Sequence, residues 1–249
     1  MPINMLKEVE ELVGSSGHCL SPSLRMTKYA KVGNKNEKAD AVKFVTNAQP
    51  LDISRFRYDF SSLRGSESFI MKLGGRLIIN QAGGVLENAG LCIHRHFGYP
   101  YIPGSGLKGI ARHAAWWEWS ETEDNSEKLA LAAEIADIFG FPTGDKQLDA
   151  VLKQNGATES KGKVSFLNAV PVKNVSLTPD ILTSHHDCDT KNPIPLPFPV
   201  VEKGAEFSFT VVSAEDQLRE KGVFWLKKAL MEDGAGAKTA AGYGWFKEV

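Results

Sequence analysis

Cysteine is scarce in this sequence, and long hydrophobic segments are absent. The 249 residues include three cysteines, Cys19, Cys92 and Cys188, which lie far apart and are odd in number. This usage argues against a disulfide scaffold and favours a reducing compartment. No run of 18 apolar residues is present, so neither a membrane-spanning helix nor a membrane partner is expected. Residues 1–17 hold three glutamates and no long apolar core, unlike a signal peptide, so we expect a cytoplasmic protein.

The chain also has almost no net charge, but its charges are unevenly distributed. Residues 1–112 contain 15 basic and 9 acidic residues, a net charge of +6, whereas residues 113–249 contain 14 and 21, a net charge of −7. A basic part joined to an acidic part indicates one region that meets an anion and another that meets a different partner. Chance together with solvated helix faces is the alternative interpretation.

Hydrophobic periodicity predicts an α+β fold. Residues 1–66 are expected to form a peripheral N-terminal extension packed on the core, with a short helix at 5–13, a loop at 33–40 and a short element at 41–47. Residues 67–249 are expected to form the main domain. We predict strands and helices in the order 69–80 (strand), 91–103 (strand), 104–119 (helix), 126–139 (helix), 162–172 (strand), 205–212 (strand), 213–231 (helix) and 242–249 (strand).

Apart from the second strand at 91–103 and one additional helix after the first crossover, this order reads as β-α-β-β-α-β, which is the ferredoxin-like (RRM-like) arrangement. Two local details are also predicted for the last helix. Ser213 and Asp216 have the spacing of a capping box at its start, and Gly222 is expected to interrupt or strain its middle.

A glycine-rich stretch, DGAGAKTAAGYGWF, occupies residues 233–246. It is not a Walker A motif, because Ala237 stands where that motif has glycine and because the stretch lies between a helix and a strand. Glycine permits positive φ angles and the close approach of another backbone. Exposed N–H groups beside Lys238 suit an extended phosphate chain. A tight turn before a C-terminal strand is the alternative.

A second candidate site is YPYIPGSGLKGIAR at residues 99–112, where a helix is predicted to begin. The free N–H groups at the start of a helix attract anions. Lys108 lies in the first turn, where a cation is normally unfavourable, and Arg112 lies one turn later on the same side. These cations are explained if an anion binds there, and a solvated Lys–Arg pair is the alternative.

The segment SHHDCD at residues 184–189 contains five potential metal ligands in a row. Their spacing matches no standard zinc pattern, and adjacent residues rarely bind one ion together. Cys92 and His94 add ligands only if the fold brings them close. We therefore expect an exposed or partner-facing loop here, and neither a metal nor another cofactor.

Aromatic residues flank the predicted basic helix start. Aromatic side chains stack on unpaired RNA bases, although at helical spacing they are more often part of the core. Trp116, Trp117 and Trp119 cannot all face one way, so we expect at least one at a protein interface. The aromatic residues concerned are Phe97, Tyr99, Tyr101, Trp116, Trp117 and Trp119.

Together these segments resemble the RAMP superfamily (repeat-associated mysterious proteins) of CRISPR systems. YIPGSGLKGIARHA is similar to the family signature IPGSSLKGALR, with Gly106 in place of the second serine. GAGAKTAAGYGWF resembles the C-terminal glycine-rich loop of these proteins. DIFGFPTGD and KGKVSFLNAVPV resemble the segment between the two motifs. The resemblance covers roughly residues 69–249.

Within the superfamily, the chain is most similar to the sixth (small RAMP) subunits of type III-B (Cmr) effector complexes. This similarity is carried by TPDILTSHH and PIPLPFPVVEKGAEFSF, and by HCLSPSLRMTKYA at residues 18–30. It implies a subunit for antiviral defence that caps a filament of backbone subunits near the 3′ end of the CRISPR guide RNA (crRNA). The implied partners are that RNA, the backbone RAMP subunit, the small helical subunit and a neighbouring RAMP subunit.

In this family the glycine-rich loop lies against the start of the first helix, and both contact the guide-RNA backbone. The resemblance therefore implies a binding surface for phosphates that does not read sequence. It implies the RNA-binding residues Gly104, Ser105, Lys108, Arg112, Gly236, Lys238, Thr239, Gly242, Tyr243 and Gly244.

We expect a non-catalytic protein, with two alternatives. The first is a RAMP endoribonuclease that uses His185, His186 and Asp187. The second is a purely structural assembly subunit that never touches RNA.

Overall fold

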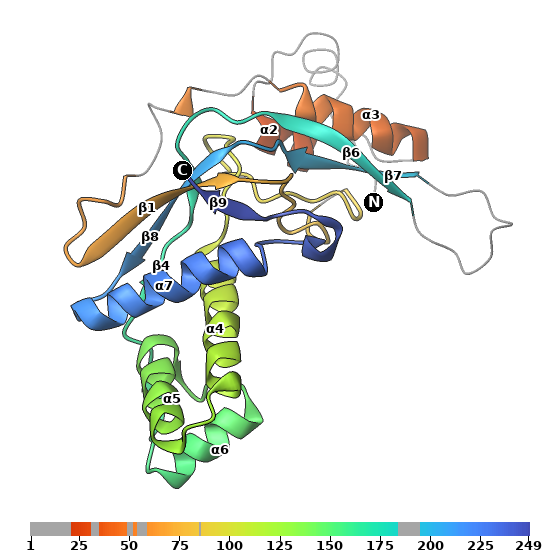
Figure 1. The fold of residues 1–249 in the computed structure, drawn as a ribbon. Coiled ribbons are helices and arrows are strands. Elements are labelled where there is room, and N and C mark those ends of the chain that lie inside the picture. The colour runs from red at the N-terminus through yellow and green to blue at the C-terminus, as the bar shows by residue number, and fades with distance from the viewer. Residues whose placement is uncertain (1–20, 31–34, 49–51, 54–58, 85, 184–194) are drawn as a thin grey trace, which may run out of the picture.

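The protein is a mixed α/β structure with antiparallel sheets, which confirms the predicted α+β class. Figure 1 shows its arrangement. The predicted helix at 5–13 lies outside the residues that the structure describes. The computed structural model describes residues 21–30, 35–48, 52–53, 59–84, 86–183 and 195–249.

The main sheet is antiparallel and is built around β1 (Ser66–Leu73). On one side β1 pairs with β9 (Phe246–Glu248), and on the other with β8 (Glu206–Val212). The far edge of β8 pairs with the two short strands β4 (Ser165–Phe166) and β5 (Val170–Pro171). The alternation predicted for β8 is confirmed, because its two phenylalanines and Val211 are fully buried.

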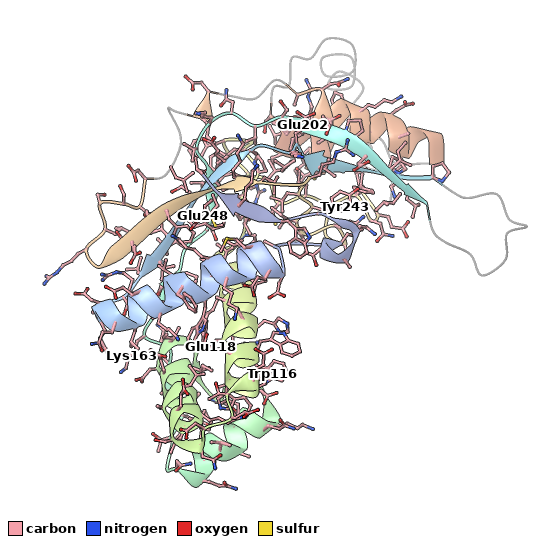
Figure 2. The ribbon with its side chains drawn as sticks, in the orientation of Figure 1. Trp116, Glu118, Lys163, Glu202, Tyr243 and Glu248 are labelled. Carbon is pink, nitrogen blue, oxygen red and sulfur yellow. The ribbon has the colours of Figure 1, made fainter. Side chains whose placement is uncertain are left out.

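Two long helices, α4 (Gly104–Glu121) and α7 (Asp216–Glu232), lie on one side of this sheet and cross each other. Glu118 of α4, labelled in Figure 2, joins them. Its carboxylate accepts hydrogen bonds from Lys221 Nζ at 2.7 Å and from Trp225 Nε1 at 2.8 Å. Trp225 itself is fully buried, so the apolar stripe of α7 and this polar bridge together fix the two helices.

A helical lobe extends from the far end of α4 and projects away from the sheet (Figure 1). It contains α5 (Asn125–Phe139) and α6 (Lys146–Gln154), each preceded by an aspartate whose side chain accepts backbone N–H groups of the first turn. The short strands β2 (Gly140–Phe141) and β3 (Ser160–Lys161) pair with each other and bring the chain back beside α5.

A second layer is formed by a two-stranded arm and one helix. The arm consists of β6 (Leu177–Thr183) and β7 (Pro195–Val201), which pair along their whole length. Helix α3 (Lys35–Thr46) packs on both strands, as Figure 1 shows. Val42 and Val45 of this helix are fully buried in the same apolar core as the main sheet.

The prolines of β7 stand at positions 195, 197 and 199 and still fit a strand. The N–H of Val201, which has the same parity, points away from β6 and donates to the Leu77 carbonyl at 3.0 Å. At these three positions a backbone N–H would face away from β6. Its absence in proline therefore removes no hydrogen bond between β6 and β7. No strand was predicted at these residues from the sequence.

The described residues before α3 form the short helix α2 (Pro22–Leu24) and the π-helical turn η1 (Arg25–Tyr29). Arg25 is buried, and its guanidinium donates to the Phe44 carbonyl at 2.7 Å and lies 4.7 Å from the centre of the Phe44 ring. These contacts hold the turn against α3.

The predicted strand at 69–80 is too long. β1 ends at Leu73, and Gly74 and Gly75 then redirect the chain. A Cβ atom on Gly75 would collide with the carbonyl oxygen of Gly242. The glycine pair is therefore needed where the C-terminal loop comes close to the chain after β1.

Three other predicted strands also differ from the structure. Residues 91–103 form only two isolated bridges, residues 162–172 divide into β4 and β5, and the final strand is limited to β9. In each segment several apolar residues are buried in the core, although they do not pair in a long strand.

Predictions for the helices were right at α4, α5 and α7 but wrong in detail. α3 begins at Lys35, within the segment predicted as a loop. α7 continues through Gly222, where a Cβ would lie 3.3 Å from Val164, so this glycine serves close packing. The hydroxyl of Ser213 accepts from the Glu215 N–H at 3.2 Å instead of forming the predicted capping box. Helix α6 was not predicted.

Candidate nucleic-acid interface

Residues 233–245, between α7 and β9, form the glycine-rich loop, which is held against the chain after β1. Ala237 N donates to the Ile78 carbonyl at 2.8 Å, and Gly244 N donates to the Arg76 carbonyl at 2.7 Å. A Cβ on Gly236 would collide with the Ile78 carbonyl. Gly236 also has φ of 94°, so the loop requires glycine there for both reasons.

Lys238 lies at the exposed tip of this loop. Its φ of 61° and ψ of 35° are left-handed, an uncommon conformation for lysine. The conformation is held because its carbonyl accepts from Ala241 N at 2.9 Å at the end of the 3₁₀ turn η3 (Thr239–Ala241). Within the described part of the chain, the Lys238 ammonium makes no ion pair. The loop therefore presents a fixed, uncompensated cation to solvent.

The end of the loop is anchored by Tyr243, labelled in Figure 2. Its hydroxyl donates to Asp180 Oδ2 of β6 at 2.6 Å, and Arg76 Nη1 donates to the same oxygen at 2.7 Å. Burial, followed by the bond to the Asp180 carboxylate, raises the pKa of Tyr243 to about 12. Burial opposes ionisation of Asp180, but its hydrogen bonds prevail and leave the pKa of this carboxyl below its ordinary value.

These contacts give the predicted RNA-binding residues of the loop different positions. Gly236, Lys238 and Gly242 are exposed, whereas Gly244 is buried and Tyr243 is 9% exposed. Thr239 is half-buried, and its carbonyl accepts from Trp245 Nε1 at 2.8 Å. The exposed members are thus placed to meet a ligand, while Tyr243 is placed to hold the loop.

The second segment is the start of α4. Pro103 precedes the helix with extended backbone and offers no side-chain cap. The N–H of Gly104 donates to Asn168 Oδ1 at 2.8 Å, and a Cβ on Gly104 would collide with the Phe166 carbonyl. Ser105 and Gly106 are exposed, and no acceptor within the described ranges meets their N–H groups. Two donors at the positive end of α4 therefore face solvent.

Three cations lie close together beside α4, beyond its first turn. Partial burial, followed by repulsion from Arg112 and Lys161, lowers the pKa of Lys108. Arg112 Nη1 donates to the Thr143 carbonyl at 2.8 Å, which fixes its guanidinium. In the region the structure describes, no carboxylate lies within ion-pair distance of any of the three. We call Lys108, Arg112 and Lys161 the cationic cluster.

Lys161 was not predicted from the sequence. It reaches the cluster because the two-residue strands β2 and β3 pair, with Lys161 opposite Gly140. Strands this short give no periodic signal. The one available hint was the position of Lys161 at the start of the KGKVSF segment, which belongs to the family resemblance.

The glycine-rich loop and the start of α4 do not touch through any hydrogen bond or ion pair among the described residues, but one backbone ladder connects them. Ala237 N bonds to Ile78, Cys92 N bonds to the Ile79 carbonyl at 3.1 Å, and Tyr101 N bonds to the Cys92 carbonyl at 3.1 Å. At about 5 Å per strand-like step, Tyr101, which lies three residues before α4, is roughly 15 Å from the glycine-rich loop along this path. The same rigid scaffold therefore carries both.

The three tryptophans of α4 face different directions, as predicted. Trp119 is buried, and Trp117 is 45% exposed. Trp116, labelled in Figure 2, lines an open hollow of about 340 Å³ together with Arg112, residues of α5 and α6, and the loop between them. Of the three, Trp117 is the most exposed.

The potential metal ligands of the SHHDCD segment cannot be placed in the structure. His185, His186, Asp187, Cys188 and Asp189 lie outside the described residues. Elsewhere in the described ranges, no three His, Cys, Asp or Glu side chains gather to suit a metal ion. In those ranges no helix combines the length and the apolar character needed to cross a bilayer.

A sheet covered by two helices, with a cationic helix start and a glycine-rich loop on one scaffold, defines a protein suited to binding an extended anion. The sequence profile of the RAMP superfamily matches residues 27–247. The chain therefore belongs to the RAMP superfamily, which confirms the resemblance on which the sequence prediction rested.

One named relative was found both by sequence and among solved structures. The CRISPR system Cmr subunit Cmr6 of Pyrococcus furiosus is 26% identical over 221 residues, covering 70% of this chain and 65% of the relative. The match thus spans less than two thirds of that protein. The crystal structure of Cmr6 from Pyrococcus furiosus aligns with 75% of this chain and 99% of its own, at 26% identity and a TM-score of 0.48.

A third comparison concerns the fold alone. A chain in the cryo-EM structure of type III-B Cmr-beta bound to cognate target RNA superposes with a TM-score of 0.62 at 19% identity. The alignment covers 86% of this chain and 75% of that chain. The fold described above is therefore shared with a protein chain of that structure.

Proposed function

We propose that the protein is a non-catalytic, guide-RNA-binding RAMP subunit of a type III-B (Cmr) effector complex. Membership of the RAMP superfamily and the similarity to Cmr6 support this assignment. The observation that carries the RNA-binding role is the cationic cluster, in which three positive charges lie close together beside α4 and, among the described residues, make no ion pair. Cations gathered in this way repel one another unless an anion binds between them.

We assign a ferredoxin-like core to this subunit. The strands of the main sheet lie in the order β4-β8-β1-β9, and every neighbouring pair is antiparallel. α4 follows β1, and α7 follows β8. Numbered by their position in a β-α-β-β-α-β unit, the strands have the order 2-3-1-4, which supports the ferredoxin-like arrangement.

RNA would be held through its phosphates at two places. At the start of α4, the N–H groups of Ser105 and Gly106 and the cationic cluster would bind one stretch of backbone. At the glycine-rich loop, Lys238 and the exposed backbone at Gly236 and Gly242 would bind another. None of these groups distinguishes one base from another, so the protein would hold any guide and leave base pairing to read the target.

Assembly into the complex would use other surfaces. We propose a place at the end of the backbone filament near the guide 3′ end, next to the backbone RAMP subunit, the small helical subunit and a neighbouring RAMP subunit. The exposed Trp117 on the helical lobe is suited to such a contact, since tryptophan is enriched at protein interfaces.

The test compares RNA binding by the wild-type chain, Lys108→Ala/Lys238→Ala and a control, Lys153→Ala/Lys203→Ala. The control removes the same charge from exposed lysines of α6 and of the β7–β8 turn. We expect the first variant to bind unrelated RNAs much more weakly and to similar extents, while the control binds like the wild type. Equal affinity of all three proteins would contradict the proposal.

The same samples separate the two alternatives. RNA that stays intact is expected for a non-catalytic subunit. Cleavage that His185→Ala or Asp187→Ala abolishes would instead indicate an endoribonuclease. A chain that binds its protein partners without any RNA contact would indicate a purely structural role.

A further inference from the structure

A turn over residues 93–100 places a group of aromatic rings between the two proposed phosphate-binding segments. The ring of His94 stacks on Phe97 at 4.8 Å with an angle of 14° and on Tyr99 at 4.8 Å with an angle of 29°. Tyr101 meets His94 edge-on at 6.5 Å. The bridge between Ile93 and Pro100 closes the turn, so the rings stand on a fixed backbone.

These rings form one wall of a cavity of about 240 Å³, which we call the aromatic basin. Its lining residues are Phe60, His94, Tyr99, Tyr101, Asn168 and Val170. Tyr99 and Val170 are almost fully buried and form its firm base. The cavity is smaller than the 300–1,000 Å³ usual for drug-sized ligands, so it fits a single planar ring.

The basin adjoins the start of α4. Asn168 lines the basin and at the same time accepts the hydrogen bond of Gly104 N through its Oδ1. Its amide nitrogen makes no hydrogen bond within the described part of the chain and is a donor available to a ligand in the cavity. Tyr101 joins the basin to the backbone ladder that leads to the glycine-rich loop. A group bound in the basin would therefore lie beside the path that the RNA backbone is proposed to follow.

We propose that the aromatic basin receives one unpaired base of the bound RNA, stacked against Tyr101, while the neighbouring helix start holds the adjoining phosphate. This inference rests on the proposed RNA-binding function. Stacking suits any base, because each has a π-face, so the basin would add affinity without adding sequence preference. Burial and the nearby His96 lower the pKa of His94, which favours a neutral ring at pH 7.

The test uses the full-length chain and a single-stranded RNA that carries 2-aminopurine, whose fluorescence falls when the base stacks. Tyr101→Leu removes the aromatic face but keeps apolar bulk, and Tyr101→Phe keeps the ring as a matched control. We expect Tyr101→Leu to weaken binding roughly five- to a hundredfold, since one stacked base contributes about that much. Tyr101→Phe is expected to bind like the wild type.

Salt dependence separates this effect from loss of charge. Tyr101→Leu removes no cation, so the slope of log K against log salt concentration is expected to equal that of the wild type. Fluorescence quenching is expected in the wild type and in Tyr101→Phe, and to be lost in Tyr101→Leu. Circular dichroism checks that both variants are folded.

The outcomes distinguish this inference from the proposed function. Salt-sensitive binding that is equal in Tyr101→Leu and Tyr101→Phe overturns the base-binding basin and leaves RNA binding in place, as expected if a protein side chain fills the basin. Absence of RNA binding by the wild type overturns both. If Tyr101→Leu does not fold, crosslinking of 4-thiouridine RNA to the wild type decides. Crosslinks at residues 94–101 support the basin, and crosslinks confined to α4 and the glycine-rich loop overturn it.

Discussion

Gly109 of α4 gives a sharp prediction, because no contact among the described residues explains a glycine there. It lies in the interior of a helix with no left-handed φ, and a Cβ added to it would meet no atom of those residues within 4 Å. Glycine at such a position is less stable than alanine by about 0.5–1 kcal/mol. Gly109 shares a helix face with Ser105, Lys108 and Arg112. We infer that a side chain at 109 would keep RNA phosphates away from this face.

Gly109→Ala is therefore expected to be more stable and yet to bind RNA less well. The free energy of unfolding should rise by about 0.5–1 kcal/mol, and the melting temperature by about 1–4 °C. Loss of about one hydrogen bond to a phosphate, on the order of 1 kcal/mol, should weaken RNA binding about fivefold. Thermal unfolding and an RNA titration on the same preparations measure both effects.

Gly106→Ala is the matched control. Gly106 is also helical, and a Cβ there also meets nothing within 4 Å. It lies away from the face that carries Lys108 and Arg112, and the family signature has a serine at this position. Alanine keeps the backbone N–H that is proposed to bind phosphate, and its methyl group faces away from Lys108 and Arg112, so Gly106→Ala should gain stability and keep its RNA affinity. A Gly109→Ala variant that is stabilised and binds RNA like the wild type would refute the close approach of RNA to this face.

Three further predictions concern other contacts. Tyr243→Phe should lower the free energy of unfolding by about 1 kcal/mol, because the hydrogen bond to Asp180 is lost. The pKa of Tyr243 is raised from 10 to about 12, so the stabilisation is complete below pH 10 and is lost between about pH 10 and 12. The stabilities of wild type and variant should therefore converge in that range, and a constant difference would contradict the Asp180 bond. Glu118→Gln should lower the free energy of unfolding by about 1–3 kcal/mol and shift the fluorescence of Trp225, because the bridge between α4 and α7 is weakened. An unchanged free energy of unfolding would show that Glu118 does not stabilise the contact between the two helices. Lys161→Ala should reduce the salt slope of RNA binding by about 0.7, and an unchanged slope would place Lys161 outside the interface.

The parts of the fold with regular periodicity could be predicted from the sequence. One face is buried in each of α4, α5, α7 and β8, and the spacing of the apolar residues predicts that face. The arm could not be predicted in the same way. Its prolines argue against a strand by composition, and only the direction of the N–H of Val201, which is set by pairing with Leu77, shows why a strand is possible.

The candidate site was predictable where its motifs are local. The GSGLKG helix start and the GAGAKTAAGYG loop each contain the backbone features that the structure shows, including positive φ at Gly236 and Gly242. Contacts between distant residues were invisible. Asp180 holds Tyr243 across 63 positions of the chain, and Lys161 comes near Lys108 only through a two-residue strand pair. The sequence therefore indicated which segments form the candidate site but not which side chains anchor them.

The helix start and the glycine-rich loop are proposed to hold the same RNA. The test is the salt dependence of RNA binding for the wild type, Lys108→Ala, Lys238→Ala and the double variant. For single-stranded RNA each lost phosphate contact reduces the slope by about 0.7. We expect a reduction of about 0.7 in each single variant and about 1.4 in the double variant, with intact RNA throughout. A slope that changes in one single variant and not in the other would contradict it.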